Sequence, residues 1–108
     1  MVTGAGVGIG HAICLALAQA GAAVVAVARN RPNLDLLAGA MPAGAHRFRP
    51  IDLATTEGCA QLVHELKQGD MPVIVVNNLH IPSPKVRLRN TSAEAFSSGF
   101  TAHLNHML

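Results

Sequence analysis

Hydrophobic residues near the start of the chain follow two different patterns in turn. From Ile9 they recur at helical spacing, and the pattern ends at Gly21, a residue suited to the backbone conformation that follows a helix. Residues 22–28 then form a continuous Val-rich run, typical of a strand buried on both faces of a parallel sheet. With residues 1–3 as the end of an earlier strand, the pattern predicts a strand–helix–strand unit with a glycine-dense turn at residues 4–10.

Two further helices and strands are predicted along the chain. Pro32 suits the first position of a second helix, which we expect Gly39 to close. Polar residues starting at Thr55 predict the beginning of a third helix that ends before Gly69. The strands expected around this helix are residues 46–52 and the continuously apolar residues 73–76.

The last quarter of the chain predicts a loop and one more helix. Two prolines lie in a loop over residues 81–88, and residues 91–94, Thr-Ser-Ala-Glu, have the form of a capping box. Strands that alternate with helices about 25 residues apart imply parallel pairing and right-handed crossovers. We therefore expect an α/β fold, a Rossmann-like doubly wound parallel sheet. It would be partial, with about four strands in the order 3-2-1-4 and flanking helices.

The composition limits the partners of the protein. Half of the residues are hydrophobic and only 13% are charged, with a formal net charge of +2. Lysines and arginines are scattered, so neither nucleic acid nor a membrane is an expected partner, and a small molecule is. Cys14 and Cys59 lie in predicted helices without metal-type spacing, which favours reduced thiols in the cytoplasm and no metal site.

The glycine-dense turn is the first candidate for chemistry. Between a strand and a helix, glycines permit a tight turn, let backbone amides approach a pyrophosphate and let the helix pack closely on the strand. The spacing here is T-G-x-x-x-G-x-G, carried by Thr3, Gly4, Gly8 and Gly10. A phosphate-binding NTPase is disfavoured because no Lys-Ser or Lys-Thr pair follows the glycines.

This loop resembles the cofactor loop of the short-chain dehydrogenase/reductase family. The resemblance implies that Ile9 and the four motif residues contact a dinucleotide; a structural turn without a ligand is the alternative. Where NAD enzymes place an acidic residue after the second strand, this chain has Ala28, followed by Arg29 and Asn30. An arginine there suits the 2′-phosphate of NADP, so NADP is the expected cofactor, with NAD possible; Arg29 as an ordinary solvated residue is the alternative.

Three more segments match the family in order. Asp52 and Leu53 resemble the pair that holds the adenine ring, although Asp52 could also cap the next helix. Asn77 and Asn78 resemble the start of the family motif N-N-A-G, from which Leu79 and His80 depart. The resemblance makes Asn78, Leu79 and His80 cofactor contacts, with His80 as a solvated loop residue the alternative.

The last predicted helix matches the family register through Phe96 and Phe100. This register puts His103 at the position of the family's catalytic Asn, with Asn105 as the alternative. Those two positions point about 200° apart on a helix, so only one can face a site.

The resemblance implies an oxidoreductase that moves hydride between NADP(H) and a carbonyl or alcohol substrate. The family's catalytic Tyr-x-x-x-Lys is absent, because the chain contains no tyrosine. We therefore expect residues 1–108 to be the amino-terminal portion of one NAD(P)-binding domain, inactive alone, from a longer protein that forms homo-oligomers. The alternative is a nucleotide-binding module without catalysis.

Overall fold

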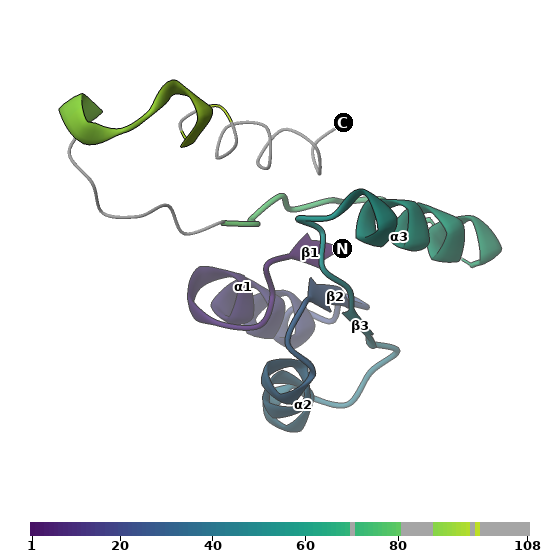
Figure 1. Ribbon diagram of the computed structural model, residues 1–108. Coiled ribbons are helices and arrows are strands. Elements are labelled where there is room, and N and C mark those ends of the chain that lie inside the picture. The colour runs from purple at the N-terminus through teal and green to yellow at the C-terminus, as the bar shows by residue number, and fades with distance from the viewer. Residues whose placement is uncertain (70, 81–87, 96, 98–108) are drawn as a thin grey trace.

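The computed structural model describes residues 1–69, 71–80, 88–95 and 97. Strands and helices alternate along the chain (Figure 1), as the hydrophobic pattern predicts. In chain order the elements are β1 (Val2–Thr3), α1 (Gly8–Gln19), β2 (Val25–Ala28), α2 (Arg31–Ala40), β3 (Arg47–Pro50), α3 (Thr56–Gln68) and the short 3₁₀ helix η1 (Leu88–Asn90).

The three strands form one parallel sheet in the order β1-β2-β3. Ala26 of β2 is central, since it pairs with Val2 on one side and Phe48 on the other. On the free edge of β1, Val76 forms a single parallel bridge with Val2. The predicted strand order is therefore confirmed for the first three strands, and Val76 lies where the fourth was expected.

The prediction of a fourth strand over residues 73–76 is wrong for this structure, in which Val76 alone makes an isolated bridge. Val73 is fully exposed, and Ile74 and Val75 are also exposed. Pairing is limited because β1 has only two residues: Val76 N donates to Met1 O at 2.8 Å, and Thr3 N donates to Val76 O at 3.1 Å. An apolar run becomes a buried strand only where other elements cover it, and nothing in the described part of the chain covers this one.

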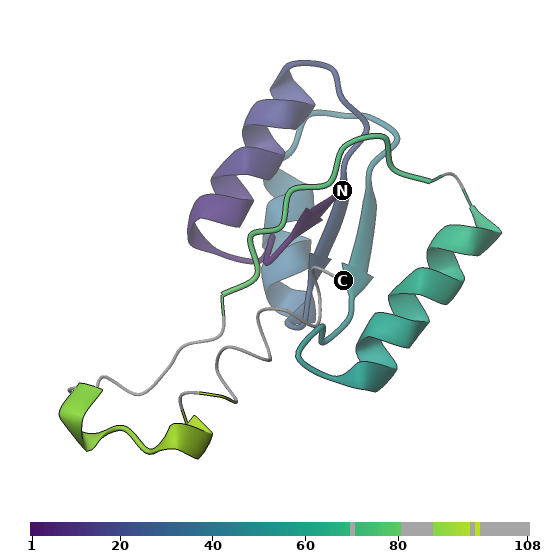
Figure 2. The same ribbon diagram turned by 90° about the horizontal axis from the view of Figure 1, so that it is seen from above.

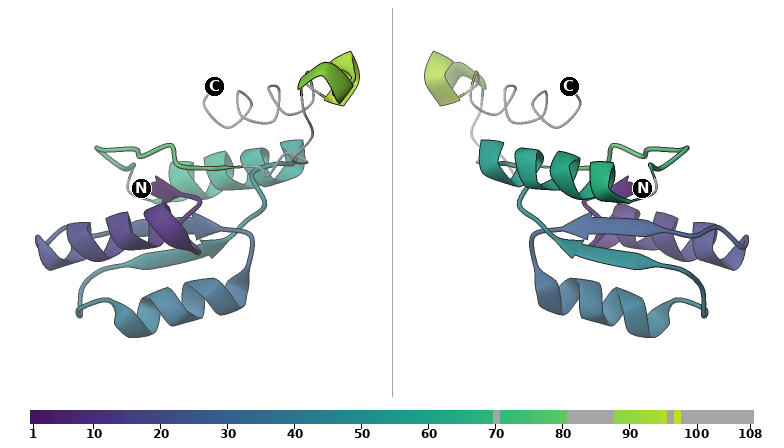
Figure 3. Two further views of the ribbon diagram at one scale, coloured as in Figure 1. Left: turned by 90° about the vertical axis from the view of Figure 1, so that its left-hand side faces the viewer. Right: turned by 90° about the vertical axis from the view of Figure 1, so that its right-hand side faces the viewer.

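The helices lie on both faces of the sheet. Figure 3 shows α2 and α3 on opposite sides of β2 and β3, and Figure 2 shows α1 and α3 on either side of the strands. Successive residues of β2 alternate between these faces: Ala26 joins the buried cluster under α1 and α2, and Val27 joins the one under α3. This arrangement confirms the doubly wound α/β class.

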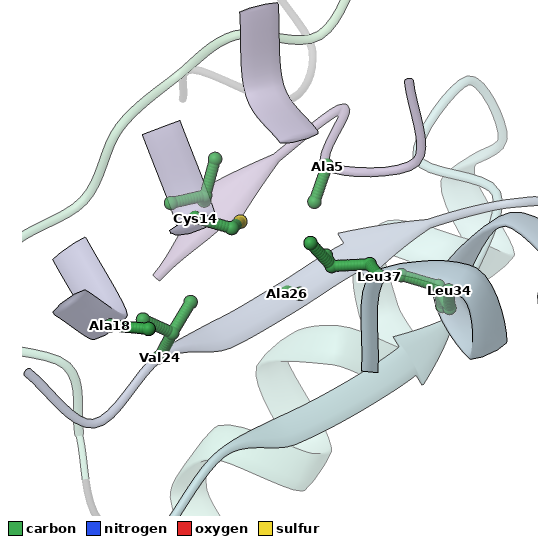
Figure 4. Packing of buried hydrophobic residues seen from close by; sticks show 8 residues of the cluster. Ala5, Cys14, Ala18, Val24, Ala26, Leu34 and Leu37 are labelled. Atoms are coloured by element: carbon green, nitrogen blue, oxygen red, sulfur yellow. The ribbon is translucent and has the colours of Figure 1, made fainter. Parts of the chain in front are cut away.

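Small side chains allow α1 to approach the sheet closely. Its buried residues are Gly10, Cys14 and Ala18, and Figure 4 shows Cys14 and Ala18 facing the strands. Leu34 and Leu37 of α2 fill the remainder of this face and are fully buried. The opposite face is smaller and is made by Val27, Ile51, Leu53 and Leu62.

Helix ends agree with the sequence signals in part. Thr55 caps α3, because its Oγ1 accepts from Gly58 N at 3.0 Å, as predicted. Gly39 does not close α2; it lies inside the helix, which ends at Ala40 and is capped through Met41 N.

None of the helices in the described ranges is long and apolar enough to cross a membrane.

The last predicted cap is displaced by one residue. Ser92 Oγ accepts from Ala95 N at 3.1 Å, so Ser92 is the capping residue where the capping box put Thr91. The adjacent hydroxyls of a Thr-Ser pair are both suitable acceptors, which is why the pattern alone did not separate them. The predicted loop over residues 81–88 and the helix face at Phe96, Phe100 and beyond fall almost wholly outside the described residues.

Candidate functional site

A cleft of about 500 Å³ lies at the carboxyl ends of the strands. Open parallel sheets bind ligands at this edge, at the point where the strand order reverses; here that point is β1, which has β2 on one side and Val76 on the other. Four segments line the cleft, one after each strand and one after Val76: residues 4, 6, 7 and 9; residues 27–30 with 33; residues 51–54; and residues 78–80.

Glycines shape the turn after β1 in different ways. Gly4 and Gly8 have φ values of +63° and +59°, a conformation that other residues adopt only with strain. A Cβ on Gly10 would overlap the carbonyl oxygen of Gly4 and lie 2.6 Å from Asn78 Nδ2. Gly10 therefore allows α1 to approach the turn, whereas the space beside Gly8 is open, since a Cβ there would have no neighbouring atom within 4 Å.

The amino-terminal end of α1 opens beside the cleft. Val7 precedes the helix without a side-chain cap, and the first turn contains no acidic residue. The first backbone N–H groups of a helix lack partners within it, and together with the helix dipole they favour a negatively charged group. An open space at Gly8 next to uncapped amides is the geometry that a phosphate group requires.

Asn78 joins the segment after Val76 to the end of β1. Its backbone N donates to Thr3 Oγ1 at 3.0 Å, and its Nδ2 donates to Gly4 O at 3.3 Å. Thr3 is buried and its hydroxyl donates to Val76 O at 3.4 Å, so Thr3 acts through these bonds rather than from the cleft wall. The amide side chain of Asn78 thus ties neighbouring strand ends together.

The end of β2 supplies a positive charge. Arg29 lines the cleft, is exposed, and has no side-chain partner among the described residues. Arg31, two residues on, is paired instead with Asp35 at 3.4 Å on the outside of α2. The side chain of Asn30 is the N-cap of α2, accepting from Asn33 N at 3.1 Å.

The segment after β3 presents one carboxylate. Asp52 Oδ1 accepts from Ala54 N at 3.0 Å, which fixes a tight turn at the cleft wall. The alternative role for Asp52 as cap of α3 is wrong, because Thr55 is the capping residue. Leu53 also lines the cleft, and it is buried in the cluster under α3.

The structure brings most of the sequence-predicted site residues to one cleft. Thr3, Gly8 and Gly10 are not among the residues that line it, and His103 lies outside the described residues. The predicted residues that line it are Gly4, Ile9, Arg29, Asn30, Asp52, Leu53, Asn78, Leu79 and His80. Sequence reasoning missed Gly6 and Asn33, which meet across the cleft corner: a Cβ on Gly6 would lie 3.3 Å from that of Asn33.

The described residues contain no metal cluster, and their two cysteines differ in burial. No group of three or more His, Cys, Asp or Glu residues within them could hold a metal ion. Both cysteines are free, and burial raises the pKa of the Cys14 thiol to about 11. A buried thiol that stays protonated is a packing residue rather than a nucleophile.

Comparison with known proteins identifies the family. The family model described as short chain dehydrogenase matches residues 1–106. The chain belongs to the short chain dehydrogenase family. A search of curated proteins found no significant match.

Solved structures of this family share the fold. A citronellol catabolism dehydrogenase from Pseudomonas aeruginosa PAO1 is 28% identical with a TM-score of 0.79, covering 98% of this chain and 46% of its own. A short-chain dehydrogenase from Streptomyces avermitilis is 25% identical with a TM-score of 0.77, and the match covers 95% of this chain and 38% of that one. A metagenomic short-chain oxidoreductase in complex with NADP is 24% identical with a TM-score of 0.73, and the match covers 98% of this chain and 52% of that one. Other matching structures were solved with NADH.

The chain spans about half or less of the length of these structures, from 38% to 52%. The family and the fold thus follow from the comparisons.

Proposed function

We propose that residues 1–108 form the amino-terminal, cofactor-binding portion of an NAD(P)-binding domain, and that the cofactor is preferentially NADP. The observation that carries this proposal is the cleft at the carboxyl ends of β1, β2 and β3, with the turn of Gly4 and Gly8 on one side and Arg29 on the other. The open space at Gly8 and the uncapped end of α1 fit a pyrophosphate.

The preference for NADP is supported by the end of β2. Ala28 stands where a carboxylate would repel a 2′-phosphate, and Arg29 is exposed beside it without a partner in the described ranges. A guanidinium can bind a phosphate through two parallel hydrogen bonds. Asp52 and Leu53 are proposed to hold the adenine ring, and Asn78, Leu79 and His80 to contact the nicotinamide ribose.

The proposed substrate is a small carbonyl compound or alcohol. When bound, the nicotinamide of the cofactor supplies or accepts the hydride. We propose that these 108 residues alone bind the cofactor without turnover, because the sequence has no tyrosine for the family's proton transfer. The two free cysteines support a cytoplasmic location, and a homo-oligomer remains our proposal for the full-length protein.

Two neighbouring arginines allow a matched test of the cofactor site. Arg29→Ala removes the cleft guanidinium, whereas Arg31→Ala removes the same charge from a side chain paired with Asp35 outside the cleft. Hydrogen bonds to a charged group contribute about 1.5 to 3 kcal/mol, so Arg29→Ala should lose NADPH affinity by roughly 10- to 150-fold and leave NADH affinity nearly unchanged. Fluorescence titration of both cofactors measures this directly.

The control separates a local contact from general attraction. Arg31→Ala should shift the affinities for NADPH and NADH by about twofold or less, since dissolved salt screens the interaction between an exposed charge and a distant ligand. Equal NADPH preference in wild type and Arg29→Ala would remove Arg29 from the cofactor site. Failure of the wild-type chain to bind either cofactor would contradict the proposed function itself.

A further inference from the structure

Asn33, in the first turn of α2, presents a carboxamide to the cleft that nothing else in the described chain uses. Its backbone N is bound by Asn30 Oδ1, but its side chain makes no hydrogen bond with any described residue. The side chain is half-buried and lines the cleft. An amide nitrogen in such a position has two N–H donors free for a ligand or for water.

The contacts of Gly6 locate this carboxamide within the cleft. A Cβ on Gly6 would lie 3.3 Å from the Cβ atoms of both Ala28 and Asn33, and 3.6 Å from Asn33 Nδ2. Ala28 stands at the strand end that meets the ribose 2′ position in dinucleotide-binding folds. Asn33 therefore borders the same corner as Ala28, directly across the glycine turn.

We propose that Asn33 is a second determinant of cofactor preference, whose Nδ2 donates a hydrogen bond to the 2′-phosphate that Arg29 neutralises. This inference rests on the proposed function. Among the described cleft-lining residues the only carboxylate belongs to Asp52, on the segment after β3 and already bound to Ala54 N. A corner that combines a guanidinium, an amide and a glycine suits a phosphate better than a ribose hydroxyl pair.

An isosteric exchange tests the proposal. Asn33→Asp keeps the shape of the side chain but replaces two donors with a negative charge, and Asn33→Ala removes the donors alone. Leu36→Asp is the matched control, because it adds the same charge to an exposed position of α2 that does not line the cleft. Isothermal titration with 2′,5′-ADP and 5′-AMP isolates the 2′-phosphate from the rest of the cofactor.

The expected result is a selective loss. Asn33→Ala should weaken 2′,5′-ADP binding by about tenfold, the size of one hydrogen bond to a charged group. Asn33→Asp should weaken it further, while 5′-AMP affinity changes by about threefold or less in both variants. Leu36→Asp should leave both affinities within about twofold of wild type.

Other outcomes overturn the proposal at different levels. An unchanged ratio of 2′,5′-ADP to 5′-AMP affinity in both Asn33 variants, with wild type still preferring 2′,5′-ADP, contradicts the role of Asn33 and spares the proposed function. If the wild-type chain binds neither nucleotide, both proposals are wrong. Circular dichroism melts of each variant test whether lost affinity reflects lost folding. We expect both Asn33 variants to stay folded, because the cap of α2 uses the backbone N of Asn33 and not its side chain.

Discussion

Replacement of Gly8 by alanine should separate cofactor binding from folding. Gly8 and Gly21 both have positive φ, +59° and +88°, and neither would have an atom within 4 Å of an added Cβ. Alanine therefore introduces the same backbone strain and no collision at either position. The difference is location: Gly8 lies between the cleft-lining Val7 and Ile9, and Gly21 follows the opposite end of α1.

The size of each effect follows from this geometry. Holding an L-residue in the left-handed region costs about 1 to 2 kcal/mol. In a small domain each kcal/mol lost lowers the midpoint of thermal unfolding by roughly 4 to 8 °C, and we expect a decrease of this order in both variants. Only Gly8→Ala places a methyl group in the space beside the uncapped amides of α1. If a pyrophosphate occupies that space, Gly8→Ala should lose at least about tenfold in NADPH affinity, through lost charge-assisted hydrogen bonds.

A valine at Gly8 would be a poorer probe, because a β-branched residue at positive φ is a much stronger outlier and would disturb the fold as well. Gly10→Ala provides the opposite extreme. Its Cβ would overlap Gly4 O and crowd Asn78 Nδ2, so we expect loss of cooperative folding rather than a local binding defect.

The assay is a pair of measurements on each variant: thermal unfolding by circular dichroism, and NADPH titration at a temperature where both variants are folded. We expect Gly8→Ala and Gly21→Ala to melt together and to bind differently. Equal NADPH affinity of the two variants would refute the placement of the pyrophosphate at Gly8, whatever the stability result.

Two further predictions concern stability and thiol chemistry. Thr55→Ala removes the oxygen that accepts from Gly58 N and should destabilise the chain by about 1 kcal/mol in urea denaturation without changing NADPH affinity; a larger effect on binding than on stability would contradict this. Only Cys59 should react readily with a thiol reagent in the folded chain, because the Cys14 thiol is buried with its pKa raised to about 11. Since the unfolded chain loses that proton near pH 9, stability should fall between about pH 9 and 11, and Cys14→Ala should flatten this fall.

The elements predicted correctly are those whose signals are local. The Val-rich run before Arg29 and the hydroxyl of Thr55 each fix an element through nearby residues alone. Residues 73–76 carry the same kind of apolar run but form only the bridge at Val76. Whether such a run is buried depends on elements packed against it, and a single run of residues carries no information about them.

The residues of the candidate site were likewise predicted only in part. Arg29, Asp52 and Asn78 were predicted from the resemblance to the family, and they meet in the structure because parallel strands bring their carboxyl ends to one edge of the sheet. Asn33 and Gly6 were missed because their pairing arises from the close approach of α2 to the glycine turn. The Asn-x-x-Asn spacing of residues 30–33 is compatible with the helix cap that the structure shows at Asn30, but it does not say what the second side chain faces.

The carbonyl oxygen of Gly4 contributes both to the packing of the fold and to the candidate site. Asn78 Nδ2 donates to it, and it is the atom that a Cβ on Gly10 would meet first. The turn, the start of α1 and the segment after Val76 thus all lie against this carbonyl, and Gly4 is among the residues that line the cleft. Changes there cannot distinguish binding from folding, whereas Gly8 and Arg29 border open space and can be altered with little repacking. The open side of the cleft is therefore where variants report on the ligand, and the side packed against Gly4 is where they report on the fold.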